Sequence, residues 1–159
     1  MSEFEIREEP GRRTAVVHGS MPQSEMPGFM DGAFPRLFHA VGAAGLVPGG
    51  APFSRYFAFA PERVEFEVGV PLADIPGMPP RAFDGAGDVQ PGELPAGQVA
   101  TGWHVGPYDT ISETYARLMA WVAEQGREPS GAMWEVYATD PGAEPDPAKW
   151  RTQLFVPLA

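Results

Sequence analysis

Two stretches of the chain repeat one another: Phe34-Pro-Arg-Leu-Phe-His-Ala-Val-Gly-Ala-Ala-Gly-Leu-Val-Pro-Gly-Gly-Ala-Pro-Phe53 and Tyr115-Ala-Arg-Leu-Met-Ala-Trp-Val-Ala-Glu-Gln-Gly-Arg-Glu-Pro-Ser-Gly-Ala-Met-Trp134. When the two stretches are aligned without gaps, seven positions are identical: Arg36/Arg117, Leu37/Leu118, Val41/Val122, Gly45/Gly126, Pro48/Pro129, Gly50/Gly131 and Ala51/Ala132. Tyr56 and Tyr137 follow at the same spacing. Such a repeat predicts one structural unit that occurs twice. We expect the copies over about residues 1–78 and 88–159 of a single domain, 1–159, with a linker rich in Pro, Gly and Asp between them.

The second copy shows the pattern of the unit most clearly. Residues 98–105 are rich in β-branched and aromatic side chains, which predicts a strand. Thr110 and Glu113 have the spacing of a capping box, and Gly126 stands where a helix is expected to end. Two further strands are expected over 132–139 and 150–156. The helix should bury the stripe Ile111, Tyr115, Leu118 and Val122, with Glu113 and Arg117 as an exposed pair.

The first copy follows the same order. We expect a strand over 13–18, a helix over 34–44 with Pro35 in its first turn, and paired strands over 53–59 and 64–70. A further strand over 4–8 opens the chain. The sequence therefore predicts an α+β protein in which strand–helix–strand–strand units form an antiparallel sheet.

Composition excludes several classes of function. The 159 residues include 11 Lys+Arg and 21 Asp+Glu, a formal net charge of −10, which argues against direct DNA binding. Cysteine is absent, so disulfides, thiolate metal sites and a cysteine nucleophile are excluded. The histidines His18, His39 and His104 have no metal-binding spacing, and we expect neither metal nor cofactor. With no signal peptide or membrane-spanning stretch in view, we expect a soluble, cytoplasmic protein.

Three motifs of the second half resemble a known family: Gly106-Pro-Tyr-Asp109, Trp134-Glu-Val-Tyr-Ala-Thr-Asp-Pro141 and Asp146-Pro-Ala-Lys-Trp-Arg-Thr-Gln-Leu-Phe-Val-Pro157. They resemble the GyrI-like effector-binding domains, which are fused to AraC- and MerR-type regulators and also occur alone. The resemblance implies an eight-stranded antiparallel arrangement with two helices on one face and a ligand groove between the two halves. It also implies binding of lipophilic, often cationic, compounds by a groove with an acidic residue. Members often have Glu where this chain has Gln153, which weakens a strongly charged version of the groove.

Strand alternation selects the residues that we expect to line this groove. Trp134 and Val136 suit the apolar helix stripe, which leaves Met133, Glu135 and Tyr137 on the opposite face. The repeat adds Ser54 and Tyr56 at the matching positions of the first copy. Trp103 and Tyr108 flank the strand-to-helix turn, and their rings are candidates either for stacking on a planar ligand or for burial against the other half. The alternative for Glu135 is a solvated glutamate on an open sheet face.

Three functions are compatible with these patterns. The first is a stand-alone domain that binds lipophilic, cationic small molecules. The second is a hydrolase of strained, cyclopropane-bearing compounds, with Glu135 activating a water molecule and Tyr137 donating a proton. The third is a protein-interaction module similar to a gyrase inhibitor. Exposed strand edges leave a homodimer open.

Overall fold

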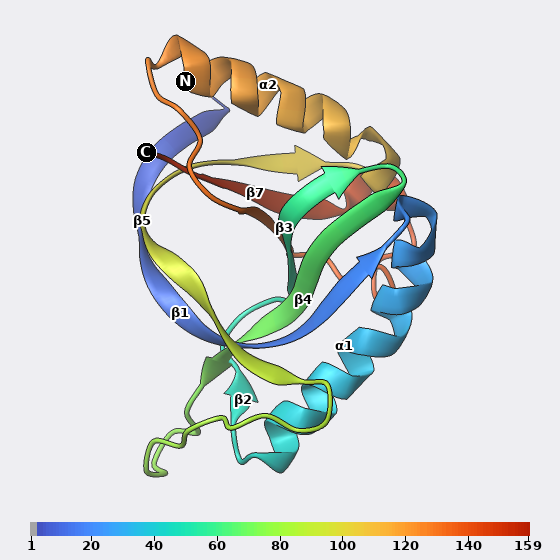
Figure 1. Ribbon diagram of the computed structural model, residues 1–159, viewed down its shortest axis with the longest axis vertical. Helices are drawn as coiled ribbons and strands as arrows, with labels where there is room; N and C mark the ends of the chain where they lie inside the picture. The colour runs from blue at the N-terminus through green and yellow to red at the C-terminus, as the bar shows by residue number, and fades with distance from the viewer. Residues whose placement is uncertain (1–2) are drawn as a thin grey trace. The chain divides into compact units, whose positions relative to one another are not determined.

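The computed structural model describes residues 3–159 of the chain (Figure 1). In chain order, the elements are β1 (Phe4–Met21), α1 (Met26–Ala43), β2 (Val47–Pro48), β3 (Phe53–Ala60), β4 (Arg63–Ala73), β5 (Gln90–Val105), α2 (Ile111–Glu124), β6 (Met133–Tyr137) and β7 (Arg151–Pro157). Short 3-10 turns precede α1, α2 and β7. The described strands form a mostly antiparallel seven-stranded sheet, which confirms the predicted α+β class. The described residues contain seven strands where the resemblance implied eight, and the expected strands 4–8 and 13–18 form one continuous strand, β1.

The chain divides into two compact units. The N-terminal unit comprises Gly11–Pro95, and the C-terminal unit comprises the chain up to Pro10 together with Ala96–Ala159. Both β1 and β5 are long enough to contribute to each unit. Each unit has its own hydrophobic core and its own helix.

In the N-terminal unit, β4 lies between β1 and β3, and α1 packs against this sheet (Figure 1). Val17 of β1 and Ser54 of β3 both lie opposite Val68, so these residues share the face that α1 covers. The core of the unit combines Leu37 and Val41 with apolar residues of β1 and β4. Alternation therefore leaves the odd-numbered residues of β4, including Glu65 and Glu67, on the opposite face.

The first helix begins earlier than the sequence predicted. It starts at Met26, with Pro27 in its first turn, and Pro35 lies inside it rather than at its start. Pro27 suits a first turn because the amide that proline lacks would be unpaired there. The helix continues through Pro35 because it buries residues on both sides of that position, Ala33 and Leu37.

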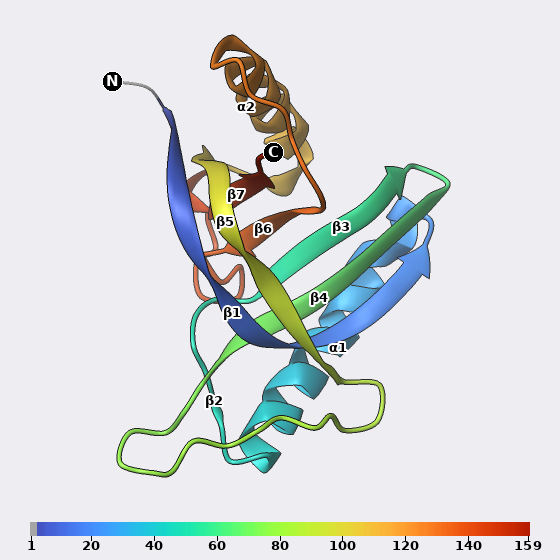
Figure 2. The same cartoon turned by 60° about the vertical axis from the view of Figure 1, so that its left-hand side comes forward.

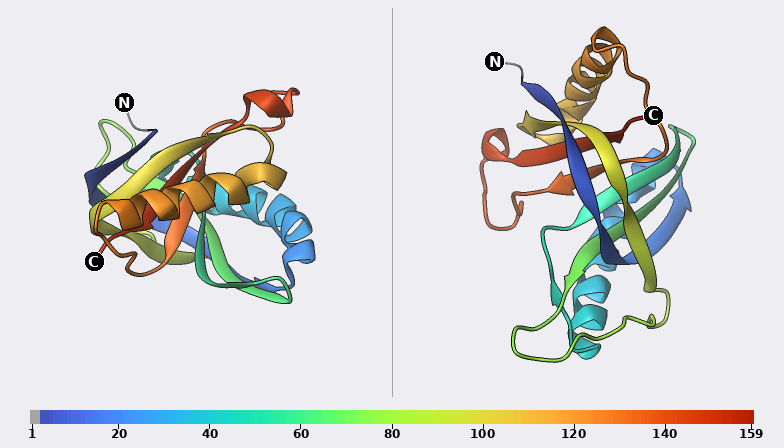
Figure 3. Two further views of the ribbon diagram at one scale, coloured as in Figure 1. Left: turned by 90° about the horizontal axis from the view of Figure 1, so that it is seen from above. Right: turned by 90° about the vertical axis from the view of Figure 1, so that its left-hand side faces the viewer.

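In the C-terminal unit, β7 lies between β5 and β6, and α2 covers one face of these strands (Figures 2 and 3). The predicted helix stripe is confirmed, since Leu118 and Val122 are fully buried against Leu154 and Val156 of β7. The same cluster includes Phe4 of β1.

The predicted capping box and surface pair of α2 are wrong. Thr110 makes no side-chain cap hydrogen bond, and its hydroxyl donates to the Pro107 carbonyl at 3.1 Å. Arg117 donates from Nε to a Glu3 carboxylate oxygen at 3.0 Å and not to Glu113. The helix α2 instead begins directly after a short 3-10 turn, Tyr108–Thr110.

The predicted orientation of β6 is also wrong. Trp134 stacks on Phe155 of β7, with ring centroids 5.2 Å apart and planes 9° from parallel. Met133 instead packs against the α2 core, and Glu135 lies opposite Leu154 on that same face. The stacking of the Trp134 and Phe155 rings holds the tryptophan on the face away from α2, where it was not predicted to lie.

None of the helices in the described chain is long and apolar enough to cross a membrane.

Candidate functional site

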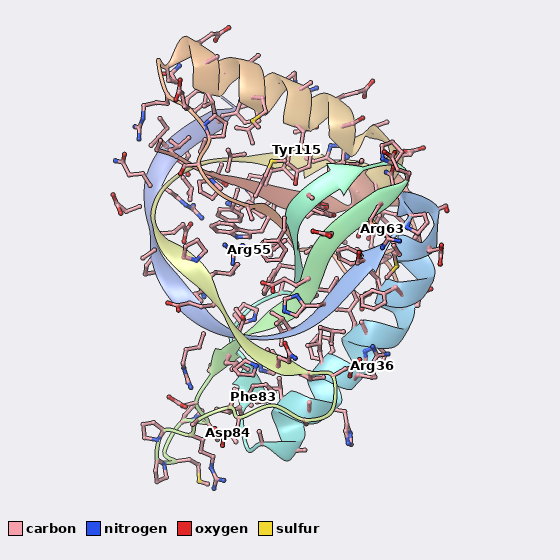
Figure 4. The ribbon with its side chains drawn as sticks, viewed as in Figure 1. Arg36, Arg55, Arg63, Phe83, Asp84 and Tyr115 are labelled. Atoms are coloured by element: carbon pink, nitrogen blue, oxygen red, sulfur yellow. The ribbon has the colours of Figure 1, made fainter. Side chains whose placement is uncertain are left out.

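Glu135 is a buried carboxylate between β6 and α2. The residue is only 6% exposed, and its carboxylate accepts a hydrogen bond from the Tyr115 hydroxyl at 3.2 Å. Tyr115 lies on the strand-facing side of α2 (Figure 4). A carboxylate in such a place is stable only when polar or charged groups compensate for the water it loses. The phenol of Tyr115 also fixes the direction of the carboxylate.

Aromatic rings continue from this carboxylate towards the surface. The Tyr108 ring lies 5.7 Å from the Tyr137 ring and 5.2 Å from the Trp150 ring. Trp150 is held by a hydrogen bond from its Nε1 to the Glu144 carbonyl at 2.8 Å. Tyr108 is 37% exposed and forms the outer part of the group. We call this group the Glu135 cluster, and it consists of Glu135, Tyr108, Tyr115, Tyr137 and Trp150.

Two phenols of the cluster, those of Tyr115 and Tyr108, are held in their neutral form. Burial raises the pKa of Tyr115 well above its usual value, and the negative charge of Glu135 raises it further. Burial, Glu135 and Asp140 together raise the pKa of Tyr108. A phenol with a raised pKa is a hydrogen-bond donor and a weak acid. These two tyrosines are therefore suited to holding a charge or a ring in place.

A buried histidine fixes the turn that carries Tyr108. His104 of β5 is 4% exposed, and its Nδ1 lies 2.7 Å from the Thr114 hydroxyl of α2. Its Nε2 lies 2.8 Å from the Pro107 carbonyl. Gly106 has a φ of 127°, a backbone angle that residues with a side chain rarely adopt. It turns the chain from β5 towards α2. These contacts tie Tyr108 to the start of the helix that carries Tyr115.

The predicted site residues fall into three places. Glu135, Tyr137 and Tyr108 come together in the Glu135 cluster, with Met133 on the same face. Trp103 lies on the other face of the C-terminal unit, where the Arg151 guanidinium sits 4.3 Å from its ring centroid. Ser54 and Tyr56 belong to the N-terminal unit, on the face that α1 covers.

A family model for the GyrI-like small-molecule binding domain matches residues 2–159. The chain belongs to this family. No curated protein sequence matches the chain significantly.

Several solved structures share the GyrI-like fold. The EcmrR C-terminal domain is similar at a TM-score of 0.82 and 21% identity, over 98% of this chain and 96% of that one. The chain spans only 56% of the EcmrR chain in its cryo-EM complex with DNA. SAV2435 bound to tetraphenylphosphonium is similar at a TM-score of 0.67 and 10% identity, over 99% and 94% of the two chains. A hydrolase encoded by lin2189 from Listeria innocua is similar at a TM-score of 0.68 and 13% identity, over 98% of this chain and 91% of that one.

Two members of the Glu135 cluster were missed by the sequence analysis. Tyr115 belongs to the predicted buried stripe of the helix. Its hydroxyl indicates a polar partner inside the unit, because a buried tyrosine needs a hydrogen-bond partner. Trp150 was placed only as the start of a strand. Its contact with Tyr108 depends on the loop before β7, which sequence patterns do not specify.

A second buried carboxylate, Glu67, was also missed. The alternation of Glu65 and Glu67 with valine and phenylalanine suggests a solvated face, yet Glu67 is only 5% exposed. Within the described residues, no group of three or more metal-binding side chains comes together.

Proposed function

We propose that this GyrI-like domain binds lipophilic organic cations at the Glu135 cluster. The observation that carries the proposal is a buried carboxylate joined to a run of aromatic rings within one unit. The carboxylate would attract the cationic centre, and the rings would cover the apolar substituents. Aromatic faces add a cation–π attraction of about 0.5–2 kcal/mol.

Charge and family membership support the same ligand class. A net charge of −10 raises the local concentration of cations around the protein. SAV2435, which has the same fold, was solved with the lipophilic cation tetraphenylphosphonium bound. Its 10% identity carries no residue assignment to this chain, so the case for the ligand site depends on the Glu135 cluster itself.

Hydrolysis by Glu135 and Tyr137 is the weaker alternative. General acid catalysis favours a proton donor whose pKa lies near the working pH. Tyr115, which donates to Glu135, and Tyr108, which packs on Tyr137, have raised pKa values, so neither of these two phenols is an efficient additional proton donor. The cluster is therefore better suited to binding a cation than to protonating a leaving group.

Calorimetry with two ligands on three proteins tests the binding proposal. The ligands are tetraphenylphosphonium and the neutral triphenylphosphine oxide, and the proteins are the wild type, Glu135→Gln and Glu113→Gln. Glu113 is an exposed glutamate of α2 and serves as the matched control. We expect Glu135→Gln to weaken the cation about tenfold, because it removes the charge and keeps the shape. The neutral ligand and the control variant should change little.

Two results would contradict the proposal. Equal losses for both ligands would mean that Glu135 acts through packing and not through its charge. An unchanged affinity for tetraphenylphosphonium in Glu135→Gln would place the ligand elsewhere.

A further inference from the structure

The N-terminal unit carries a hollow of about 410 Å³ on the sheet face that α1 does not cover. Its lining consists of His18, Gly19, Ser20, Phe57, Glu65 and Phe66. Gly19 lies opposite Phe66 in the β1–β4 register, and the Phe66 side chain points into the core beneath α1. By strand alternation, the neighbouring side chains of His18, Ser20 and Glu65 point the other way and form the rim.

Glu65 supplies a carboxylate that is available to a ligand. It is exposed, and no other described residue gives it a side-chain hydrogen bond or an ion pair. The nearby cation, Arg63, donates instead to the Ser20 hydroxyl at 2.8 Å. Arg63 is therefore held at the rim without neutralising Glu65.

Glu67 lies on the same sheet face as the hollow and faces basic side chains of both neighbouring strands. It lies directly opposite His18 of β1 and Arg55 of β3, its carboxylate oxygens being 3.7 Å from His18 Nε2 and 3.9 Å from a terminal nitrogen of Arg55. The same Arg55 nitrogen donates to the Glu93 carbonyl at 3.1 Å. Arg55 and Arg63 thus lie at separate points of the β3–β4 hairpin (Figure 4). Both are engaged with groups of their own unit.

Phe57 supplies an aromatic wall. Phe57 is 49% exposed although it belongs to a strand, and the ladder with β4 is interrupted between Tyr56 and Ala58. The His18 ring lies 6.4 Å from the Phe57 ring, and the Arg55 guanidinium lies 5.2 Å from the ring centroid. These contacts hold the ring beside Glu65 with much of its surface still in water.

We propose that this hollow is a second binding site, for a small protonated amine that carries one aromatic ring. The ammonium group pairs with Glu65, and the ring of the ligand packs on Phe57. A volume of about 410 Å³ lies at the small end of the range of small-molecule sites, roughly 300–1,000 Å³. An anion is disfavoured because Glu65 and Glu67 are both acidic and the chain carries a net charge of −10. All of these residues lie outside the Glu135 cluster, so this site does not depend on the first proposal.

NMR titration of the full chain with 2-phenylethylamine, protonated at pH 7, tests the site. The neutral 2-phenylethanol is the ligand control. We expect amide shifts in β1 and β4 around Gly19 and Glu65. Glu65→Gln should weaken the amine about three- to fivefold, as for a partly exposed charge pair. Phe57→Ala should weaken both ligands, because each loses the aromatic wall.

Glu62→Gln and Glu135→Gln are the control variants. Glu62 is exposed in the β3–β4 turn and does not line the hollow, so its variant should bind like the wild type. Glu135→Gln should also leave the amine shifts around Gly19 unchanged, which separates this site from the proposed cation site. Amide shifts confined to the C-terminal unit, or equal affinity of Glu65→Gln and wild type for the amine, would overturn the proposal.

Discussion

Glu67 is a buried acid that lies between a histidine and an arginine of the two neighbouring strands. Burial raises its pKa above the ordinary value of 4.5, and the nearby charges of His18 and Arg55 oppose this effect without cancelling it. The folded protein therefore holds this proton more tightly than the unfolded chain does. The stability gained in this way is fully present below pH 4.5 and is lost as the pH rises through the raised pKa.

Glu67→Gln should remove this part of the pH dependence, because glutamine cannot ionise. We expect the free energy of unfolding of the wild type to fall relative to that of the variant as the pH rises above 4.5. Urea unfolding of both proteins over a pH series measures the difference. The exposed Glu62→Gln should follow the wild type. Parallel curves for wild type and Glu67→Gln would show that burial does not control this carboxylate.

The close approach of β1, β3 and β4 depends on Gly69. A Cβ atom at this position would lie 2.6 Å from the Ala15 carbonyl oxygen and 2.8 Å from the Phe53 ring. The carbonyl belongs to the backbone of β1 and cannot move without disturbing the strand ladder. We expect Gly69→Ala to lower the free energy of unfolding by about 1–3 kcal/mol.

The control is Gly28→Ala in the first turn of α1. A Cβ atom there would meet nothing within 4 Å, and alanine favours a helix over glycine by up to about 1 kcal/mol. Chemical unfolding should therefore rank Gly28→Ala at or above the wild type and Gly69→Ala below it. Equal stability of the two variants would mean that the strands adjust freely around Gly69.

Local sequence patterns predicted both helices and the main strands, but not the early start of α1, the short β2 or the sheet face that the second helix covers. The stripe of Leu118 and Val122 is buried as expected, because helical periodicity depends only on the chain itself. Alternation correctly grouped Met133 with Glu135, but it cannot say which group the helix covers. The Trp134–Phe155 stack and the Tyr115–Glu135 hydrogen bond decide that, and both depend on residues far apart in sequence. The burial of Glu67 was missed for the same reason, since it follows from strand register.

The two units differ in where they bury a carboxylate, although their sequences repeat one another. Tyr56 and Tyr137 both lie on the helix-covered face of their own unit, whereas the sequence analysis expected them on the face opposite the helix. The position two residues before each tyrosine differs, with Ser54 in one copy and Glu135 in the other. The helix-covered carboxylate is therefore specific to the C-terminal unit. The N-terminal unit has its buried carboxylate, Glu67, on the opposite, helix-free face.

The charge of the chain leads to a prediction about DNA. EcmrR, which is solved in complex with DNA, is longer than this chain, which spans 56% of it. Binding to DNA phosphates requires clustered Lys and Arg, whereas this chain has 11 basic against 21 acidic residues. We expect fluorescence anisotropy with duplex DNA at about 0.15 M salt to show no saturable complex tighter than about 1 μM. Lowering the salt should produce at most weak binding that does not depend on sequence, because the net charge of −10 repels the duplex. A tight complex that distinguishes one DNA sequence from another would require a basic surface that this composition does not provide.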